Sequence, residues 1–430
     1  MRERSAVWVA ATAFAAVFGT LAVLRHRAFE SGRFDLGNMT QAVWSTAHAD
    51  VLSVTDLHGE QISRLGAHFD PLLVLLTPLW WLWPSPELLL VVQAVAVGAG
   101  ALPVFWLAHK HVGSPRPAAA LALAYLLYPP THWLVMSDFH TVALACPLLL
   151  FAWWHLDEGR LWAFAPLAAA AIATKEHVGL AVAAIGVWYA IRHRAPRAGA
   201  AIATAGAAAA LTAALVVVPH FAATGSGFES RYAEPSLGAQ DLGYAAALLL
   251  PLALLPLAAP LAAAAALPEL GLNVLSETVT QTSVKTHYAA VSTAALLVAA
   301  TFAAGRLGGR AAYLAAVAAL AGAGLLGPVG RAPVRADGHD AIARRALAHI
   351  PADAPVSATN TLGAHLSARE RVFSFPVLEG ADWVAVDTRR LTYLDSTRPD
   401  RARRPLAALL RDRRFRVVFD ADGLLVLRRS

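Results

Sequence analysis

The sequence predicts an α-helical polytopic membrane protein of about eleven transmembrane helices with a small C-terminal α/β domain. Composition is the first reason, because 57% of the 430 residues are hydrophobic and only 15% are charged, which soluble globular proteins do not show. From residue 331 onward the chain holds 18 arginines and 12 acidic residues, against 17 basic and 17 acidic residues before it. We therefore predict a membrane domain at 1–330, with an outer loop at 25–70, and a soluble domain at 331–430.

Long hydrophobic runs define the predicted spans. Those at 6–24, 87–109, 198–219, 287–305 and 310–330 approach the roughly 20 residues that a transmembrane helix requires. No small-residue cleavage site closes the first run, so we predict a retained span and not a signal peptide. Shorter runs at 117–132, 138–156, 160–174 and 177–192 need tilting or pairing to cross. Prolines interrupt the stretch 242–272, and we expect it to break near Pro256 or Pro260.

Basic residues in short loops predict the orientation, since such loops are enriched on the cytoplasmic side. With a cytoplasmic N-terminus, the inner loops hold Arg2, Arg4, Lys110, Arg116, Arg160, Arg192, Arg194, Arg197, Arg306 and Arg310. The loop at 25–70 then faces outward, and an odd number of spans places the C-terminal domain outside as well. The chain is therefore predicted to be a multi-pass protein of the plasma membrane. We expect no nucleic-acid partner, because the basic C-terminal domain lies outside the cytoplasm.

The loop at 25–70 begins with a helical pattern. Its apolar residues recur at roughly helical spacing and predict a short amphipathic helix along the membrane surface: Leu36, Met39, Val43 and Trp44. Asp35 lies at the start of this helix. It fits an N-cap, which accepts a hydrogen bond from a free helix amide, and it also fits a functional acid held at the lipid–water boundary; the two roles are compatible.

Ionisable residues gather at the predicted outer ends of several spans, where charge is costly to place and so marks candidate functional sites. The candidates are Asp35, His68, Asp70, Asp138, His140, Lys175, Glu176, His177, Arg231, Tyr232, Lys285, His287 and Tyr288. Within this set, Lys175 and Glu176 fit a mutually neutralising pair. Lys175 equally fits a phosphate-binding cation, because an ammonium is a compact positive charge.

Several candidates have simpler structural explanations. Asp70 precedes Pro71, the order expected of a helix cap followed by a first-turn proline, and Asp138 fits a cap of the next helix. His68 and His140 fit amphipathic rings at the headgroup level. Alternatively, four of these residues offer the mixed nitrogen and oxygen ligands of a divalent metal: His68, Asp70, Asp138 and His140. A divalent metal is the one cofactor that the sequence suggests.

The segment 331–430 reads as alternating helices and strands. We predict helices at 337–350, 361–370 and 401–415, strands at 354–360, 371–376 and 382–388, and a hairpin at 416–429 that turns at Asp422-Gly423. The segment contains no glycine-rich phosphate loop, catalytic serine motif or cysteine cluster. Its sequence therefore indicates no chemistry of its own.

Six motifs in fixed order carry a family resemblance: FDLGNMTQAVW, HFDPLLVLLTPLW, LLYPPTHWLVMSDFHTVAL, ATKEHVGLAV, LPELGLNVLS and THYAA. Across roughly the first 300 residues the chain resembles an uncharacterised prokaryotic family of polytopic membrane proteins that carries a domain-of-unknown-function label. That family is similar to the GT-C class of membrane glycosyltransferases. The resemblance implies a GT-C-like transmembrane domain and, by extension, sugar transfer.

The resemblance to GT-C enzymes also implies site residues. In that class an acid in the first outer loop is the base that deprotonates the acceptor hydroxyl, while a polyprenyl-phosphate sugar is attacked at its anomeric carbon. By position this residue is Asp35. Many of those enzymes carry two adjacent acids there, whereas Leu36 follows Asp35 here, so Asp70 or Asp138 would supply the second acid. Glu176 is a further catalytic candidate.

The predicted function is transfer of a sugar from a polyprenyl-phosphate donor to an extracytoplasmic glycan, lipid or protein acceptor, with membrane lipids as further partners. Lys175, Arg231 and Lys285 would stabilise the charge that develops on the leaving phosphate. One alternative is a transporter or flippase of a lipid-linked substrate, since transporters also combine broken helices with intramembrane charges. Another is a non-catalytic membrane scaffold. The gathering of ionisable groups on one face favours an outward-facing site.

Overall fold

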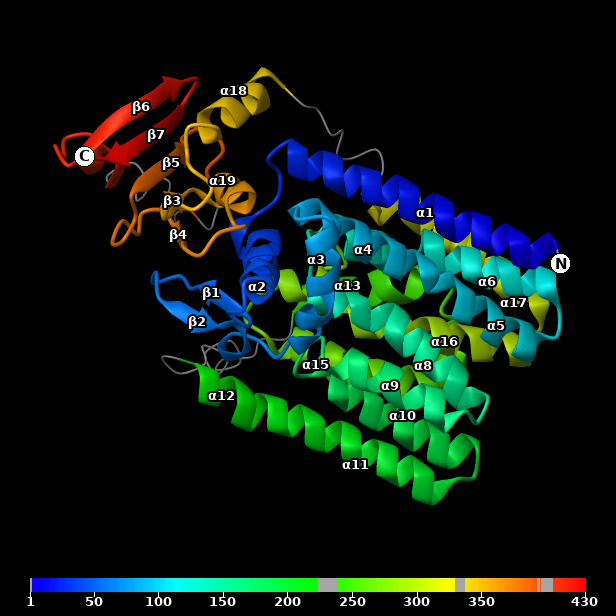
Figure 1. Cartoon of the computed structure of the whole chain (residues 1–430). Helices are drawn as coiled ribbons and strands as arrows, with labels where there is room; N and C mark the ends of the chain where they lie inside the picture. Colours follow the sequence, from blue (N-terminus) through cyan, green and yellow to red (C-terminus); the bar gives the residue numbers. More distant parts are fainter. Residues whose placement is uncertain (1, 223–237, 329–336, 393–394, 396–404) are drawn as a thin grey trace. The chain divides into compact units, whose positions relative to one another are not determined.

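The computed structural model describes residues 2–222, 238–328, 337–392, 395 and 405–430 (Figure 1). Contacts divide the chain into two compact units. The helical unit comprises Met1–Thr20, Gly66–Leu72 and Val91–Pro333, and the mixed unit comprises Leu21–Leu65, Leu73–Leu90 and Val334–Ser430. A division by contacts therefore groups the first loop with the C-terminal residues, whereas a division along the chain separates them.

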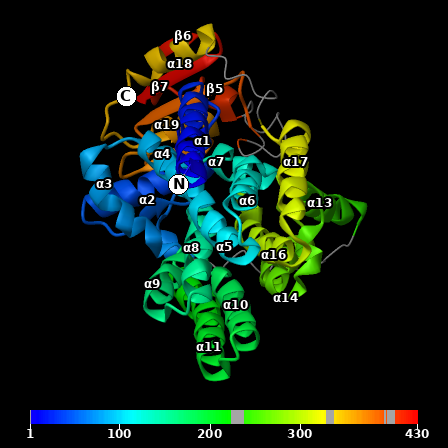
Figure 2. The same ribbon diagram turned by 90° about the vertical axis from the view of Figure 1, so that its right-hand side faces the viewer.

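The helical unit is built from helices joined by short turns (Figures 1 and 2). The helices that lie wholly or partly in it are α1 Arg2–Arg27, α4 Pro86–Ala99, α5 Ala101–Val112, α6 Pro115–Leu127, α7 Pro129–Met136, α8 Ala145–Asp157, α9 Leu161–Ile172, α10 Val178–Arg192, α11 Pro196–Thr212, α12 Val218–Phe221, α13 Ala239–Leu249, α14 Pro260–Ala263, α15 Leu267–Leu275, α16 Ala290–Leu307 and α17 Gly309–Leu326. Short 3₁₀ turns connect several of them, among them η4 Thr141–Leu144, η10 Val279–Thr282 and η11 His287–Ala289.

Helix length and apolarity identify the candidate spans. Among the described residues, five helices pass both criteria: Arg2–Arg27, Pro86–Val112, Pro196–Phe221, His287–Leu307 and Gly309–Leu326. A sixth is the pair Pro115–Leu127 and Pro129–Met136, bent by 45°. Shorter apolar helices occupy Pro71–Leu82, Thr141–Asp157, Leu161–Ile172, Val178–Arg192 and Pro260–Leu275. The helical, multi-pass character is confirmed, and the predicted total of about eleven spans is not.

The proline-rich stretch after α13 breaks close to the predicted position. Ala253 and Leu254 adopt left-handed φ angles of 52° and 59°, which non-glycine residues rarely do. The chain then passes through η8 Leu255–Ala258 and re-enters a helix at Pro260. The predicted break near Pro256 or Pro260 is therefore present, with the left-handed residues just before Pro256 and a new helix from Pro260.

The hairpin of α10 and α11 packs so closely that its glycines at the contact leave no room for a Cβ atom. A Cβ atom on Gly179 would lie 2.4 Å from the carbonyl oxygen of Gly206, and one on Gly186 would lie 2.5 Å from the amide nitrogen of Ala203. Both views show the two helices side by side (Figures 1 and 2). This packing holds the turn before α10, which carries Lys175, Glu176 and His177, at one end of the hairpin.

In the mixed unit, the first loop forms the π-helical turn η1 Arg33–Gly37 and then α2 Asn38–Ala47. A helix is thus present as predicted, but its apolar residues Leu36, Met39 and Val43 are buried inside the protein. The prediction that this apolar face lies along the membrane surface was wrong, because the side chains pack against protein. The N-cap position of η1 is Gly32 and that of α2 is Gly37. Asp35 lies within the first turn, so its assignment as an N-cap was wrong, because the helix begins two residues before it.

The C-terminal residues form a five-stranded sheet in the order β4-β3-β5-β7-β6. Its strands are β3 Val356–Ala358, β4 Val372–Ser374, β5 Trp383–Asp387, β6 Phe415–Ala421 and β7 Leu424–Arg429. β3 pairs in parallel with β4 and β5, whereas β7 is antiparallel to β5 and β6. The predicted strands and the hairpin turn at Asp422-Gly423 are confirmed, both turn residues having positive φ.

The helices of this sheet domain are shorter than predicted. α18 covers Gly338–Leu347 and α19 covers Asn360–His365. In the predicted helix at 401–415, residues 405–409 are helical and 401–404 lie outside the described residues. The core contains Phe29 of the first loop together with Val356, Trp383 and Val426. The first loop therefore completes the core of the sheet domain.

A buried arginine joins the first loop to the sheet. Arg33 is 2% exposed and donates to the carbonyl oxygen of Val372 from Nε at 3.0 Å and from Nη2 at 2.6 Å. It also donates to Ser374 Oγ at 2.7 Å, and to the carbonyl oxygen of Thr55, in β1 Ser53–Thr55, at 2.7 Å. Burial lowers the pKa of Arg33 to about 10, only partly offset by the charge of Asp56. Arg33 remains a cation at neutral pH, held by neutral acceptors.

Candidate functional site

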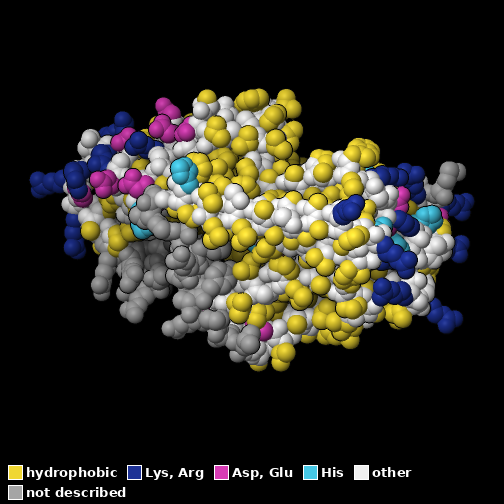
Figure 3. Space-filling view, turned by 90° about the horizontal axis from the view of Figure 1, so that it is seen from below, with side chains coloured by type: hydrophobic (Ala, Val, Ile, Leu, Met, Phe, Trp, Pro, Cys, Tyr) yellow, Lys and Arg dark blue, Asp and Glu magenta, His cyan; other side chains and the backbone are white. Residues whose placement is uncertain are grey.

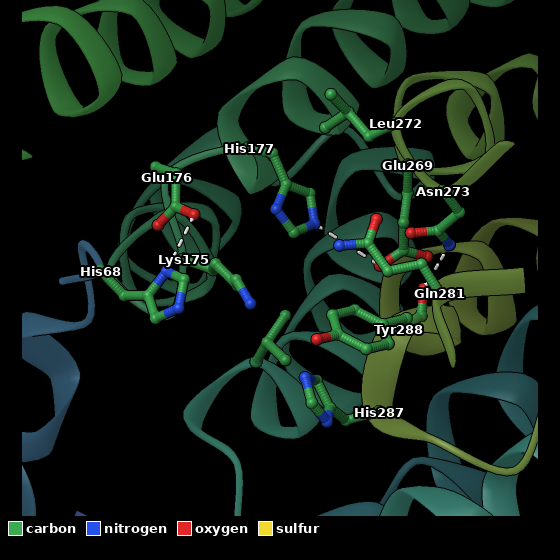
Figure 4. Close-up of a pocket in the computed structure, with 11 residues that line it drawn as sticks. His68, Lys175, Glu176, His177, Glu269, Leu272, Asn273, Gln281, His287 and Tyr288 are labelled. Atoms are coloured by element: carbon green, nitrogen blue, oxygen red, sulfur yellow. Dashed lines mark hydrogen bonds and ion pairs between the residues drawn. The ribbon is translucent and has the colours of Figure 1, made fainter. Parts of the chain in front are cut away.

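A small polar cavity lies in the helical unit where α10 and α16 begin (Figure 4). Its volume is about 30 Å³, enough for one or two water molecules. The lining residues come from separate parts of the chain: His68, Val142, Lys175, Glu176, His177, Glu269, Leu272, Asn273, Gln281, His287 and Tyr288. Tertiary folding thus brings together polar residues that lie more than two hundred positions apart in the sequence.

Glu176 is a buried carboxylate paired with a histidine. It lies in the turn between α9 and α10, its side chain is 3% exposed, and its Oε1 is 3.2 Å from Nδ1 of His68. Its Oε2 accepts a hydrogen bond from the amide of Phe69 at 3.1 Å. Burial by itself would raise the pKa of Glu176, but His68, Lys175 and His177 more than offset burial and hold that pKa well below the usual range. Glu176 is therefore ionised at neutral pH.

Glu269 forms a second carboxylate–histidine pair across the cavity. Nε2 of His177 lies 3.5 Å from Oε1 of Glu269, and Figure 4 shows the His177 ring directed toward this side of the cavity. Glu269 also accepts from the amide of Ser292 at 2.6 Å and from its hydroxyl at 2.7 Å. The carboxylate thereby accepts hydrogen bonds from amides that are left free at the start of α16.

Lys175 supplies a cation to the same cavity. Its Nζ lies 5.5 Å from the ring centroid of Tyr288, a distance typical of a cation–π contact. His287 is stacked on the ring of His140 with centroids 3.5 Å apart. The cavity thus combines a primary ammonium, histidines and two buried carboxylates. Such a set can bind an anionic oxygen and exchange protons with it.

The structure brings together six of the predicted site residues, which line one cavity: His68, Lys175, Glu176, His177, His287 and Tyr288. His140 reaches the cavity through its stacking on His287. The other candidates in the helical unit do not line it. Lys285 is exposed, and Asp70 is buried at 2% exposure directly before η3 Pro71–Leu76.

Asp138 does not have the predicted role of a helix cap. Its backbone adopts a left-handed φ of 62°, and its carbonyl oxygen accepts from Nε2 of Gln93 at 2.8 Å. The N-cap of the following turn, η4, is His140. The cap assignment was wrong because Asp138 occupies the tight turn before the helix, two residues too early.

The remaining candidates lie elsewhere. Arg231 and Tyr232 fall outside the described residues. Asp35 belongs to the mixed unit, where its side chain is partly buried. Within the described ranges there is no group of three or more His, Cys, Asp or Glu side chains that could hold a metal ion, so a metal among His68, Asp70, Asp138 and His140 stays a prediction.

Three lining residues were not predicted from the sequence: Glu269, Asn273 and Gln281. Asn273 donates from Nδ2 to the Tyr244 hydroxyl at 2.9 Å and to the carbonyl oxygen of Tyr288 at 2.7 Å. A signal was present, because Glu269 and Asn273 are four residues apart in the motif LPELGLNVLS and so share one helix face. Two polar residues on one face of an otherwise apolar helix indicate a polar partner.

Comparison with solved structures identifies the fold. The chain is similar to ArnT from Cupriavidus metallidurans bound to undecaprenyl phosphate, with a TM-score of 0.59 and 13% sequence identity over 97% of this chain and 98% of that chain. The structure of the same protein in the apo state matches with a TM-score of 0.52 over the same shares of both chains, again at 13% identity. At this identity the similarity concerns the fold.

Comparison of the sequence with known proteins gives a family and no functional relative. No curated protein matches the chain. The model of a family described as "Predicted membrane protein (DUF2079)" matches residues 25–426, which include the first loop and all of the C-terminal sheet except the last three residues of β7. The chain therefore belongs to the DUF2079 family of predicted membrane proteins.

Proposed function

We propose that this chain is a GT-C-like membrane glycosyltransferase that moves a sugar from a polyprenyl-phosphate donor to an extracytoplasmic acceptor. The observation that carries the proposal is the similarity of fold to ArnT over nearly the whole length of both chains. One of the two ArnT structures contains undecaprenyl phosphate. A lipid phosphate of that class is therefore the donor carrier we assign to this chain.

The polar cavity supports the proposal through its chemistry. Lys175 would contact a phosphate oxygen of the donor, because an ammonium stabilises charge that develops on a leaving phosphate. Glu176 and His68, 3.2 Å apart, would exchange a proton with a group that enters the polar cavity. A cavity of about 30 Å³ holds only a few atoms, so donor binding requires its lining to move apart.

Asp35 is the proposed catalytic base. The assignment rests on its position directly after the first span and on the GT-C resemblance of its motif. A base there would take the proton of the acceptor hydroxyl as the anomeric carbon is attacked, so that the sugar–oxygen bond forms while the bond to the lipid phosphate breaks. The proposed topology puts the first loop and the C-terminal domain outside the cytoplasm.

The test is Asp35→Asn in the purified full-length protein, assayed with polyprenyl-phosphate sugars. Turnover should fall by about a hundredfold or more, as is typical on losing a positioned base, while binding of undecaprenyl phosphate stays unchanged. The matched control is Asp50→Asn, which removes an exposed carboxylate from the same loop and should leave turnover unaltered.

The rival functions give different results in the same assay. A flippase would move a lipid-linked substrate between leaflets without forming a new glycosidic bond, and a scaffold would do neither. Near-normal glycosyl transfer by Asp35→Asn refutes the base assignment. If the wild-type protein binds the polyprenyl-phosphate sugar tightly and translocates it without transferring the sugar, the proposal of a glycosyltransferase is refuted.

A further inference from the structure

A second cavity, of about 190 Å³, lies where α5, α10 and α16 end. Its lining includes His111, Arg192 and Arg306, each in the last turn of one of these helices. The polar cavity described above lies instead where α10 and α16 begin. α10 has 15 residues and α16 has 18, so the two helices measure about 22 and 27 Å.

The two cavities thus lie at opposite ends of these helices. Because α16, at about 27 Å, approaches the roughly 30 Å thickness of the hydrocarbon core of a bilayer, a cavity at either of its ends would lie near a membrane face. Figure 3 shows hydrophobic side chains over the middle of the helices, and Lys and Arg side chains gathered at the right-hand end of the view. Arg192 and Arg306 belong to the predicted inner loops, whose basic residues carry positive charge of the kind that gathers at a membrane surface. The second cavity thus lies at the level of lipid headgroups.

The charge of the second cavity is positive. No carboxylate is among the described residues that line it, and neither Arg192 nor Arg306 forms an ion pair within the described part of the chain. The nearby carboxylate of Asp157 is already bound by Lys110 Nζ at 2.7 Å and by His111 Nε2 at 2.9 Å. Two arginines, both exposed, therefore line the cavity with no carboxylate partner among the described residues.

The geometry of the cavity matches an amphipathic anion. Nη1 of Arg306 donates to the carbonyl oxygen of Ala258 at 3.0 Å, which orients this guanidinium. Trp188 and Phe302 form an apolar wall, with ring centroids 5.4 Å apart and planes within 7° of each other. Both arginines line this cavity, and guanidinium groups bind phosphate oxygens in pairs. A phosphate bound there would be contacted by Arg192 and Arg306, and an attached lipid chain would lie on the aromatic wall.

We propose that the second cavity binds the headgroup phosphate of an anionic phospholipid. Basic pockets between membrane helices recognise anionic headgroups in this way. Arginines that only satisfy the general preference for basic inner loops would not discriminate between headgroups. Lipid binding by such arginines would also not depend on the shape of a cavity. The experiment therefore tests headgroup selectivity and dependence on cavity shape.

The experiment measures lipid retention by native mass spectrometry of the full-length protein, with phosphatidylglycerol and phosphatidylcholine added separately. The wild-type protein should retain phosphatidylglycerol preferentially. In the double variant Arg192→Gln/Arg306→Gln this affinity should fall about thirtyfold, since each basic residue near a lipid phosphate contributes roughly fivefold. The matched control is Arg197→Gln/Arg310→Gln, which neutralises two exposed arginines outside the cavity lining and should change the affinity less than twofold.

A second variant tests the cavity without changing its charge. Leu261→Trp adds bulk to the lining and should reduce phosphatidylglycerol binding as the double variant does. Cys146, the only cysteine and fully buried, stays unreactive to thiol probes as long as the helical unit is folded, so labelling separates lost binding from lost folding. Equal loss in the control variant, or equal binding of both lipids, overturns the proposal. Binding of inorganic phosphate that resists competition by phosphatidylglycerol would assign the site to a soluble anion and likewise overturn it.

Discussion

Two buried charge arrangements in this molecule are satisfied in opposite ways. In the polar cavity of the helical unit, Glu176 and Glu269 each face a histidine. In the mixed unit, Arg33 is equally buried, yet its partners are backbone carbonyls and one hydroxyl. The acceptors of Arg33 cannot change their charge near neutral pH, whereas histidine–carboxylate pairs share protons.

This difference separates a structural contact from a chemical site. A cation held by neutral acceptors has a constant charge and serves to join two segments, here the first loop and β4. A cavity with titratable pairs can change its charge when a substrate arrives, which is the property that proton transfer requires. The comparison can be tested by removing one group from each arrangement.

The largest expected effect follows Glu176→Gln in the polar cavity, and it rests on the proposed function. The amide keeps an acceptor for the amide of Phe69 but removes the negative charge beside His68, so turnover should fall about a hundredfold or more in the same glycosyl-transfer assay. Glu277→Gln, which changes an exposed carboxylate, is the control. Unchanged turnover and an unchanged pH profile for Glu176→Gln would show that this carboxylate is only structural.

Arg33→Met should destabilise the mixed unit by about 2 to 6 kcal/mol, because two buried carbonyl groups lose their donor and each costs roughly 1 to 3 kcal/mol. The groups concerned belong to Val372 and Thr55. Limited proteolysis of the C-terminal residues measures the effect, while the reactivity of Cys146 reports on the helical unit. The exposed neighbour Arg371 provides the control variant Arg371→Met, and equal protease resistance of both variants would contradict the role of Arg33.

The smallest effect concerns a third arrangement, in which His339 lies between two carboxylates. Its Nε2 is 2.9 Å from Asp387 and its Nδ1 is 2.8 Å from Asp422. Burial and the nearby charge of Arg390 each lower the pKa of His339. The two carboxylates more than offset both effects, so the pKa of His339 is raised above 6.5. The folded domain therefore binds this proton more tightly than the unfolded chain does.

The sign of the pH dependence follows from that shift. The stabilisation is complete below pH 6.5, the ordinary pKa of histidine, and is lost as the pH rises through the higher pKa of the folded state. Protease resistance of the C-terminal sheet should accordingly decrease above pH 6.5 in the wild type, and this decrease should be absent in His339→Gln. His349→Gln, an exposed histidine after the same helix, should behave as the wild type. A rise in resistance with pH would exclude the histidinium arrangement.

Local sequence patterns predicted the elements of this protein well. The strands of the C-terminal sheet and the turn at Asp422-Gly423 were predicted correctly, because alternation and turn chemistry are local properties. Most long helices were likewise predicted from apolar runs. The errors were local as well, since the cap positions assigned to Asp35 and Asp138 lie three and two residues away from the observed N-caps, Gly32 and His140.

The sequence by itself determined that the chain is a helical membrane protein with a small α/β domain, since hydropathy and periodicity are summed along the chain. Only the tertiary structure decided that Glu269 faces His177, and that Phe29 and Arg33 of the first loop belong with residues beyond 334. Such pairings join positions tens to hundreds of residues apart, and no local pattern encodes which distant donor meets which acceptor. The requirement that buried polar groups find partners is visible in the sequence, but the partner is chosen by the packing.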